Sequence, residues 1–391
     1  MEAVTEKAKK KICVVTSNRA EYTRVKSILQ AIKEHPQLEY LLVVIGAHLL
    51  RKYGHSYREI ENDGFVIHER IYNTVEGENP VTMAKSTGMG IIELVTVLNN
   101  HKPDYVIVPT DRYEILSAAI AAAFLNIPVV HIQGGEVTGT IDESIRHAIS
   151  KFAHVHFPAT AASRERLIRM GEDPNLVFNV GCPATDILLN VKLKAQKEVL
   201  RDEEIKNPCL KPDEPFILVL QHPVTTEFGQ GYVQIEETLY AIKDIPMQKI
   251  MLWPNVDAGS EHIVTAIRRF LHRYKLEENI IMYRHISNPL FVQLMHHCRC
   301  FVGNSSAGIR ESCYFGTPVV NIGTRQHRRE RGKNVMDADY NREQIRRAIE
   351  QQFAHGRYAA EQIFGNGTAG KQIAGILAGL NGVKVQKTIL Y

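Results

Sequence analysis

Short runs of β-branched and aliphatic residues alternate with amphipathic segments along almost the whole chain, and this alternation limits the possible folds more than any other feature. In the first half we expect strands at residues 11–16, 40–45, 104–109, 128–133, 154–158 and 176–180. Helices are expected between them at 21–34, 91–100, 115–125, 142–152 and 163–170. Continuous apolar strands that are separated by helices are typical of parallel sheets covered on both faces. The pattern therefore predicts an α/β fold.

The alternation is interrupted once, between residues 191 and 213. This stretch is charged, nearly free of aromatic residues and ends at a turn that contains proline, so we interpret it as a helix followed by an interdomain linker. Strands are expected again at 216–220, 249–254, 280–283, 300–302 and 318–322, and a last helix at 370–380. Because 391 residues exceed the usual size of one core, we predict two doubly wound domains. They comprise residues 1–190 and 214–365, with the linker region at 191–213 and a helix and tail at 366–391 that packs back on the first domain.

The composition argues against several classes of protein. The 47 Lys and Arg residues nearly balance the 43 Asp and Glu residues, and no basic block accompanies the net charge of +4, so a nucleic-acid partner is not expected. No apolar run reaches the roughly 18–20 residues that a membrane span needs, and the N-terminus does not resemble a signal peptide. The six cysteines form no CxxC pair, which is typical of reduced thiols. We therefore expect a cytoplasmic protein with no membrane partner.

The first candidates for a functional site stand after the strands, because ligands of doubly wound folds bind beyond the carboxyl ends of the strands. After the first strand, Asn18 and Glu21 have the spacing of a capping box. Arg19 then lies beside a helix N-terminus, where an anion is favoured, although a solvated arginine in a first turn fits the same pattern. Neither GxGxxG nor GxxxxGK[ST] is present, so no glycine loop for a phosphate is predicted.

Three carboxylates follow later strands of the first half. Asp111 and Arg112 come directly after the third expected strand, and Glu136 follows the fourth after two glycines that allow a tight turn. Asp142 lies in the first turn of the next helix, four residues before Arg146. A capped helix with a surface ion pair explains these residues. The alternative is a cleft in which Asp111, Glu136 and Asp142 lie close enough for their pKa values to separate, so that they act as acid and base.

The second half repeats this arrangement. His222 follows its first strand and is suited to acid–base work or to a phosphate, although a buried structural histidine gives the same pattern. Ser305 and Ser306 lie between a buried strand and a helix start, which is a suitable place for a diphosphate. Glu311 is placed to accept hydrogen bonds from ribose hydroxyls, and Arg325 follows the next strand.

One cluster has the residue types of a metal site. Residues 296–300 contain two histidines and two cysteines. They fall on a helix end and the start of a buried strand, which does not give ligand geometry, so we predict no metal there.

Taken together, seven segments resemble the hydrolysing UDP-N-acetylglucosamine 2-epimerases. These include bacterial enzymes of the sialic-acid pathway, which are the closer match, and the epimerase half of a bifunctional animal enzyme. In chain order, over roughly residues 11–365, the segments are SNRAEY, PTDR, GGEVTGTIDESIRHAISKFAH, QHPVTT, PNVDAGS, GNSSAGIRE and GTRQ. The resemblance implies a GT-B-like architecture, in which two Rossmann-like domains hold a nucleotide sugar between them. It also implies that no metal or nicotinamide cofactor is needed and that the protein is a homodimer or homotetramer.

The same resemblance implies roles for individual residues. UDP would be held mainly by the C-terminal domain, through His285, Ser305, Ser306, Glu311 and Arg325, with Asn255 nearby. Two arginines of the N-terminal domain, Arg19 and Arg112, would reach the nucleotide from the other side. Positions linked to catalysis are matched by Asp111, Asp142 and His222.

Gln133 departs from the family pattern. Well-known members have His-Ile-Glu-Gly-Gly where this chain has Gln133 in third place, and an amide cannot act as a base. The proton transfer then falls to Glu136 or Asp142, or the substrate differs, or the activity is impaired. We expect a reassigned carboxylate, with Gln133 lining the substrate site.

We therefore expect an enzyme that converts UDP-N-acetylglucosamine and water to N-acetylmannosamine and UDP through a 2-acetamidoglucal, for sialic acid biosynthesis. Asp111 or Asp142 would remove the C2 proton as UDP leaves, and a second acid would protonate C2 from the opposite face. One alternative is a hydrolysing 2-epimerase for UDP-2,4-diacetamido-2,4,6-trideoxyglucose, as in legionaminic acid synthesis. Others are a non-hydrolysing epimerase, a GT-B glycosyltransferase and a catalytically silent UDP-sugar binder.

Overall fold

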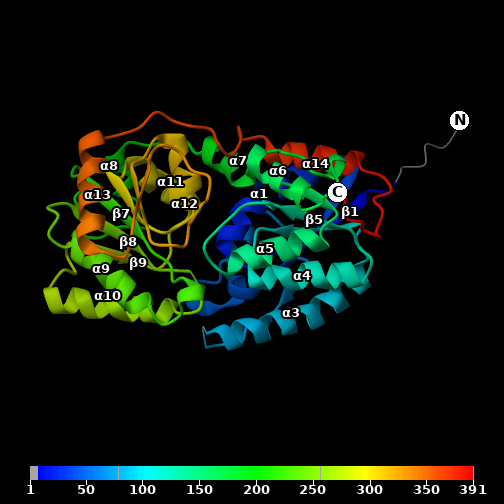
Figure 1. Ribbon diagram of the computed structural model, residues 1–391, viewed down its shortest axis with the longest axis horizontal. Coiled ribbons are helices and arrows are strands. Elements are labelled where there is room, and N and C mark those ends of the chain that lie inside the picture. Colours follow the sequence, from blue (N-terminus) through cyan, green and yellow to red (C-terminus); the bar gives the residue numbers. More distant parts are fainter. Residues whose placement is uncertain (1–7, 78, 256, 391) are drawn as a thin grey trace, which may run out of the picture.

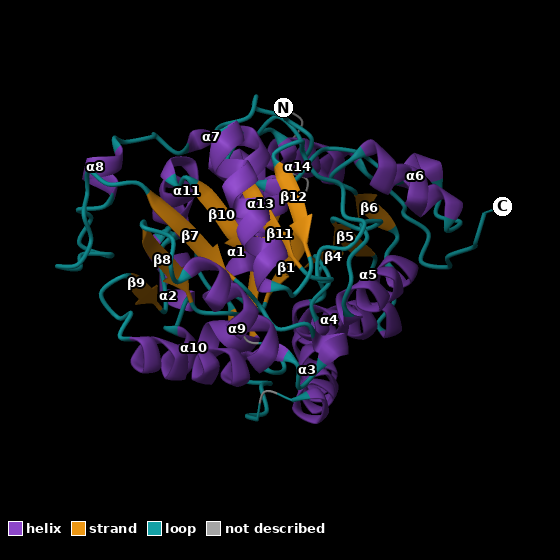
Figure 2. Ribbon diagram, turned by 60° about the vertical axis from the view of Figure 1, so that its left-hand side comes forward, coloured by secondary structure: helices purple, strands orange, loops and turns teal. Residues whose placement is uncertain are grey.

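Two parallel sheets with helices on both faces make up the computed structural model, which describes residues 8–77, 79–255 and 257–390 (Figures 1 and 2). Each sheet has six strands, in the orders β3-β2-β1-β4-β5-β6 and β12-β11-β10-β7-β8-β9. These are the same doubly wound order, with the switch points between β1 and β4 and between β7 and β10. The predicted α/β fold of two doubly wound units is confirmed.

The first sheet consists of β1 (Lys10–Thr16), β2 (Leu38–Ile45), β3 (Glu69–Ile71), β4 (Tyr105–Pro109), β5 (Val129–Ile132) and β6 (Val155–Phe157). Its helices are α1 (Arg19–Glu34), α2 (Tyr57–Asn62), α3 (Pro80–His101), α4 (Tyr113–Phe124), α5 (Ile141–Phe152), α6 (Ala161–Arg169) and α7 (Pro183–Asn190). Successive side chains of β1 point to opposite faces, so Ile12 and Val14 join the core under α1 while Cys13 and Val15 join the core under α4. Burial on both faces explains the unbroken apolar runs of the central strands.

The second sheet consists of β7 (Phe216–Leu220), β8 (Gln248–Leu252), β9 (Ile280–Tyr283), β10 (Cys300–Gly303), β11 (Val319–Ile322) and β12 (Val335–Ala338). Its helices are α8 (Gln196–Val199), α9 (Gly231–Ile242), α10 (Ser260–Tyr274), α11 (Asn288–His297), α12 (Ala307–Arg310) and α13 (Arg342–His355). The charged stretch at 191–213 contains only the four residues of α8 as α-helix.

Three local predictions differ from the structure. The strand expected at 176–180 does not form, because Asp173 caps a 3₁₀ turn at Pro174–Leu176 and only Val177 pairs with β6, through His156. The sequence did not predict strands β3 and β12. Both are short edge strands with half-exposed residues, so neither contains the continuous apolar run that marks a buried strand. Helix α3 begins at Pro80, eleven positions before the predicted start at residue 91, because Asn79 forms a capping box at its N-terminus.

Helix α3 also corrects an expectation about membranes. It is long and apolar enough to cross a membrane by length and composition, with mean hydropathy 1.3, whereas the sequence predicted no such stretch. However, Lys85 and Glu93 are exposed on this helix, so insertion into lipid would bury both charges in hydrocarbon, which is costly.

The last helix, α14 (Ala369–Gly379), returns to the first sheet and lies beside α1 (Figure 1). Ile373 and Leu377 are buried in the same core as α1. Asp186 of α7 accepts hydrogen bonds from the backbone nitrogens of Ala369 and Gly370 at 3.0 and 2.7 Å, which fixes the start of the helix. The domain boundaries at 190, 214 and 365 remain predictions, and residues 1–7 and 391 of the predicted outer segments lie outside the described residues.

Candidate active site

The carboxyl ends of the two sheets meet across the centre of the molecule. Arg112, after β4, forms an ion pair with Asp257, after β8. The backbone nitrogen of Gly139 donates to the carbonyl of Arg325 at 3.1 Å, and β11 ends shortly before Arg325. A polar cavity of about 50 Å³ is lined by residues of both halves: Arg24, Thr110, Asp111, Gln133, Thr138, Asp142, Ser306, Arg310, Arg325, Gln326 and Arg329. Residues of both halves therefore share one cavity.

Two residues at strand ends have a left-handed backbone, which is rare outside glycine. Thr110 follows β4 with φ of 63°, and Gln133 follows β5 with φ of 64°. Buried partners hold Thr110 at each polar group: its nitrogen donates to Ile132 at 3.0 Å, its hydroxyl to Glu21 at 2.9 Å, and its carbonyl lies 2.7 Å from Nε2 of His131. Such fixed, unfavourable conformations are typical of functional sites, and both lie at the cavity, which Thr110, Asp111 and Gln133 line.

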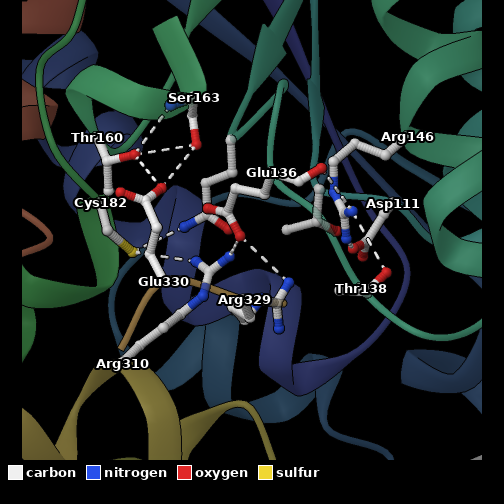
Figure 3. Close-up of polar contacts among 12 residues, drawn as sticks. Asp111, Glu136, Thr138, Arg146, Thr160, Ser163, Cys182, Arg310, Arg329 and Glu330 are labelled. Carbon is white, nitrogen blue, oxygen red and sulfur yellow. Dashed lines mark hydrogen bonds and ion pairs between the residues drawn. The ribbon is translucent and has the colours of Figure 1, made fainter. Parts of the chain in front are cut away.

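Asp111 is held by a buried arginine. Arg146 on α5 forms an ion pair with Asp111, and Nη1 of the same guanidinium donates to the carbonyl of Glu136 at 3.1 Å (Figure 3). Its contact with Glu143 is longer, at 3.4 Å. The surface ion pair with Asp142 that the helical spacing predicted is wrong, because Arg146 faces the interior and its side chain is only 1% exposed. An adjacent guanidinium favours the ionised carboxylate, so Asp111 is suited to accept a proton.

The surroundings of Asp142 instead favour its protonated form. It lies half-buried in the first turn of α5, where its nitrogen donates to the hydroxyl of Thr140 at 3.2 Å. Burial and, next, the negative charge of Asp257 raise the pKa of Asp142, against the influence of Arg112 and Arg325. Two carboxyls in one cavity therefore favour different protonation states, as an acid–base pair requires.

Glu136 is held between guanidinium groups of the other half of the molecule. It forms ion pairs with Arg310 and with Arg329, the latter at 3.1 Å (Figure 3). Its other oxygen, Oε1, is buried without a hydrogen-bond partner in the described chain. Glu136 does not line the cavity. Its geometry is that of a bridge between the two halves, and its predicted catalytic role stays a prediction.

Gln133 lines the cavity, as expected, and its amide orientation is fixed. Arg24 of α1 donates from Nε to the amide oxygen at 3.0 Å, and the amide nitrogen donates to the sulfur of Cys182 at 2.7 Å. A carboxylate at this position would face the same guanidinium. The site therefore holds an amide where the family pattern has an anion, and this amide is bound to a guanidinium.

One ring nitrogen of His222 is already occupied, and the predicted catalytic role of this residue stays a prediction. It is buried, and its Nδ1 accepts a hydrogen bond from the backbone nitrogen of Asn255 at 3.0 Å. The proton of the neutral ring therefore lies on Nε2. Burial, reinforced by the charge of Arg325, lowers the pKa of His222 to about 3.

The residues expected to hold a nucleotide fall into two groups. Ser306 and Arg325 line the cavity, and Ser305 and Glu311 are near neighbours of Ser306 along the chain. Glu311 is half-buried with Oε2 unpartnered among the described residues, and burial raises its pKa. Arg19 and His285 contact each other at 3.4 Å across the two halves, while the side chain of Asn255 is exposed.

Five charged residues of the site were not predicted as such: Arg24, Arg146, Asp257, Arg310 and Arg329. Arg146, Asp257 and Arg310 lie inside segments that carry the family resemblance, and Arg329 lies in the short basic run after β11. Four arginines and only two carboxylates line the cavity, and the buried Nε atoms of Arg310 and Arg329 have no partner within the described chain. This excess of positive charge favours an anionic ligand. The described residues place no group of three or more His, Cys, Asp or Glu side chains where a metal ion could bind.

A family model described as UDP-N-acetylglucosamine 2-epimerase matches residues 30–378. A Legionella pneumophila protein named UDP-N,N'-diacetylbacillosamine 2-epimerase (hydrolyzing) is 35% identical over 358 residues, which are 92% of this chain and 93% of that protein. A Neisseria meningitidis protein named UDP-N-acetylglucosamine 2-epimerase is 32% identical over 358 residues, or 92% and 91% of the two chains. The fold is similar to the crystal structure of UDP-GlcNAc 2-epimerase from Neisseria meningitidis bound to UDP-GlcNAc, with a TM-score of 0.79, 19% identity and coverage of 95% and 100%. The predicted GT-B-like pair of Rossmann-like domains is confirmed.

Proposed function

Because the chain belongs to the UDP-N-acetylglucosamine 2-epimerase family, we propose that it hydrolyses UDP-N-acetylglucosamine to N-acetylmannosamine and UDP through a 2-acetamidoglucal. The observation that carries the proposal is the pair Asp111 and Asp142. They line one cavity, and one is paired with a guanidinium while burial raises the pKa of the other. An epimerisation by proton removal and return needs this difference between two carboxyls.

In the first step Asp111 removes the proton from C2. The electrons of the C2–H bond form the C1=C2 double bond, and those of the C1–O bond leave with the diphosphate of UDP. Arg24 and Arg325, with the hydroxyl of Ser306, line the same cavity and would stabilise the charge that develops on the diphosphate. The neutral His222 adds a hydrogen-bond donor on Nε2 from the second half of the molecule.

In the second step Asp142 returns a proton to C2 from the opposite face while water adds to C1. The proton released by that water restores Asp142, and the proton that Asp111 took from C2 leaves to the departing UDP or to solvent, so atoms and charge balance over the cycle. Glu136, which is bound to two arginines, is not needed for either transfer. We assign it instead to holding the two halves together around the substrate.

The size of the cavity supports a closing motion. About 50 Å³ is far below the roughly 300–1,000 Å³ of typical ligand pockets, so a nucleotide sugar enters only when the two halves separate. Closure then excludes bulk water from the glucal. A cytoplasmic location, a place in sialic acid biosynthesis and a homodimeric or homotetrameric state belong to the same proposal.

Proton NMR in deuterated water, with UDP-N-acetylglucosamine and without acceptor or metal, tests this function. We expect free UDP and N-acetylmannosamine that carries deuterium at C2. The variant Asp111→Asn should release no UDP but still bind it. Unchanged substrate would refute the proposal. Turnover of only the 2,4-diacetamido-2,4,6-trideoxy sugar would place the chain in the legionaminic branch, and UDP release that depends on an acceptor would identify a glycosyltransferase.

A further inference from the structure

The loop after β11, residues 323–334, reaches from the second half of the molecule to the first. The backbone nitrogen of Gly139 donates to the carbonyl of Arg325 at 3.1 Å. A side chain added at Gly139 would come within 1.9 Å of the carbonyl oxygen of Thr324, so only glycine allows this close approach. Three residues of the loop line the cavity: Arg325, Gln326 and Arg329. The loop is therefore both a wall of the site and a contact between the two halves.

Glu330 in this loop binds the start of helix α6. The hydroxyl of Thr160, the residue before α6, donates to Oε2 of Glu330 at 2.6 Å, and the same hydroxyl oxygen accepts from the backbone nitrogen of Ser163 at 3.1 Å (Figure 3). The hydroxyl of Ser163 lies 3.4 Å from that carboxylate oxygen. A helix N-terminus carries partial positive charge, and hydrogen bonds to a carboxylate are stronger than neutral ones. The start of α6 is therefore a suitable partner for a carboxylate from the other half.

The tip of the loop has a conformation that needs support from its surroundings. Arg328 is exposed and has a left-handed backbone with φ of 58°, which is unfavourable outside glycine. The next residue, Arg329, is fixed on both sides, by Gln326 of its own loop at 2.7 Å and by Glu136 of the first half at 3.1 Å. Glu330 adds the contact with α6. Strained conformations persist only where neighbouring groups hold them, so separation of the two halves would release this tip.

Glu330 has no part in the proton transfers of the proposed mechanism. It is not among the residues that line the cavity, and its carboxylate is bound to the start of α6. We infer that Glu330 is a positioning residue, which latches the loop onto α6 when the two halves close and so sets Arg325 and Arg329 against the diphosphate. This inference rests on the proposed function, because that function places a diphosphate in the cavity.

The latch should affect binding more than chemistry. Asp111 and Asp142 both belong to the first half, so removing the latch leaves their arrangement unchanged. Without the Glu330 carboxylate the closed state loses a charged hydrogen bond, which corresponds to about tenfold in its population. The apparent affinity for UDP falls with that population. We therefore expect Glu330→Ala to raise the Kd for UDP and the KM by about tenfold, and to lower kcat by less than about threefold.

The test is calorimetric titration of the full chain with UDP, together with kcat and KM for UDP-N-acetylglucosamine. Glu330→Gln keeps an acceptor for Thr160 but not the charge, so its Kd should lie between that of the wild type and that of Glu330→Ala. Gly139→Ala should also weaken UDP binding by about tenfold or more, since the added methyl group keeps the loop from docking. The matched control is Glu350→Ala, which removes an exposed carboxylate that pairs with Arg346 within α13 and should leave the Kd unchanged.

Small-angle X-ray scattering measures closure directly. The wild type should become more compact as UDP is added, and Glu330→Ala should need about tenfold more UDP for the same change. Thermal unfolding of each variant shows that the fold is intact.

Several results would overturn the latch. They are a Kd for Glu330→Ala within about twofold of the wild type, a fall in kcat as large as the rise in KM, an equal loss in Glu350→Ala, or a wild type whose dimensions do not respond to UDP. A wild type that binds UDP but leaves UDP-N-acetylglucosamine unchanged would refute the proposed function alone, because the UDP titrations would still test the latch. A wild type that binds no UDP would overturn both.

Discussion

Replacing Arg146 with glutamine tests whether Asp111 depends on a buried counter-charge. Only 1% of the Arg146 side chain and 17% of the Asp111 side chain are exposed, so water screens this ion pair little. Removing one partner of a buried pair costs about 3–5 kcal/mol, and the partial exposure of Asp111 places the expected loss of stability at about 3 kcal/mol. The freed carboxylate also moves, and a displacement of about 1 Å lowers a rate by about 100-fold. We therefore expect a less stable protein with a kcat about 100-fold lower.

The assay measures UDP release, with urea unfolding and UDP binding followed on the same samples. UDP binding should not change, because Arg146 does not line the cavity. Arg146→Lys keeps the charge but not the planar guanidinium that reaches both Asp111 and the carbonyl of Glu136. Its kcat should therefore lie between that of the wild type and that of Arg146→Gln. Arg169→Gln, on the surface of α6, is the control. A kcat for Arg146→Gln within about fivefold of the wild type would refute the reasoning.

Two further predictions concern acid. His222 is buried and uncharged, with a pKa of about 3 against an ordinary 6.5. Its contribution to stability is therefore complete above pH 6.5 and is lost as the pH falls toward 3. Over that range the free energy of unfolding of His222→Asn should fall less than that of the wild type. Burial opposes the charge of Glu172, but hydrogen bonds from His156 and Lys387 lower its pKa to about 2 from an ordinary 4.5, so the stability it contributes is lost as the pH falls from 4.5 to 2. Lys387→Met should therefore unfold at a higher pH in an acid titration followed by circular dichroism, and an unchanged midpoint would contradict this account.

The fold was predictable wherever burial is two-sided. The central strands β1, β4, β7 and β10 each contain an unbroken buried apolar run, and their predicted bounds agree with the structure to within a residue. The edge strands β3 and β12 carry no such signal, since one face meets solvent. The strand predicted at 176–180 shows the converse, because the apolar residues there pack against the first core while only Val177 pairs with the sheet, through a single bridge to His156.

The sequence predicts those residues of the site that follow the ends of strands. Asp111, Gln133, Asp142, Ser306 and Arg325 follow strands of two sheets and all line one cavity. Arg24 and Arg146 lie inside helices, where periodicity indicates a face but not the tertiary partner on it. The spacing of Asp142 and Arg146 predicts a pair along the helix, whereas the structure places a strand-end carboxylate within closer reach of the guanidinium. Contacts between the two halves, such as Glu136 with Arg310, have no local signature at all.

The return of α14 to the first core sets an order of events during protein synthesis. Ile373 and Leu377 cover α1 in the finished protein, yet the ribosome makes them after every strand of both sheets. At about 5–20 residues per second, the nascent first half waits on the order of tens of seconds with that apolar surface bare. The second half has all its strands and helices by then. The part of the molecule that is made first is thus the last to be completed, and during translation it is the part that needs protection by chaperones.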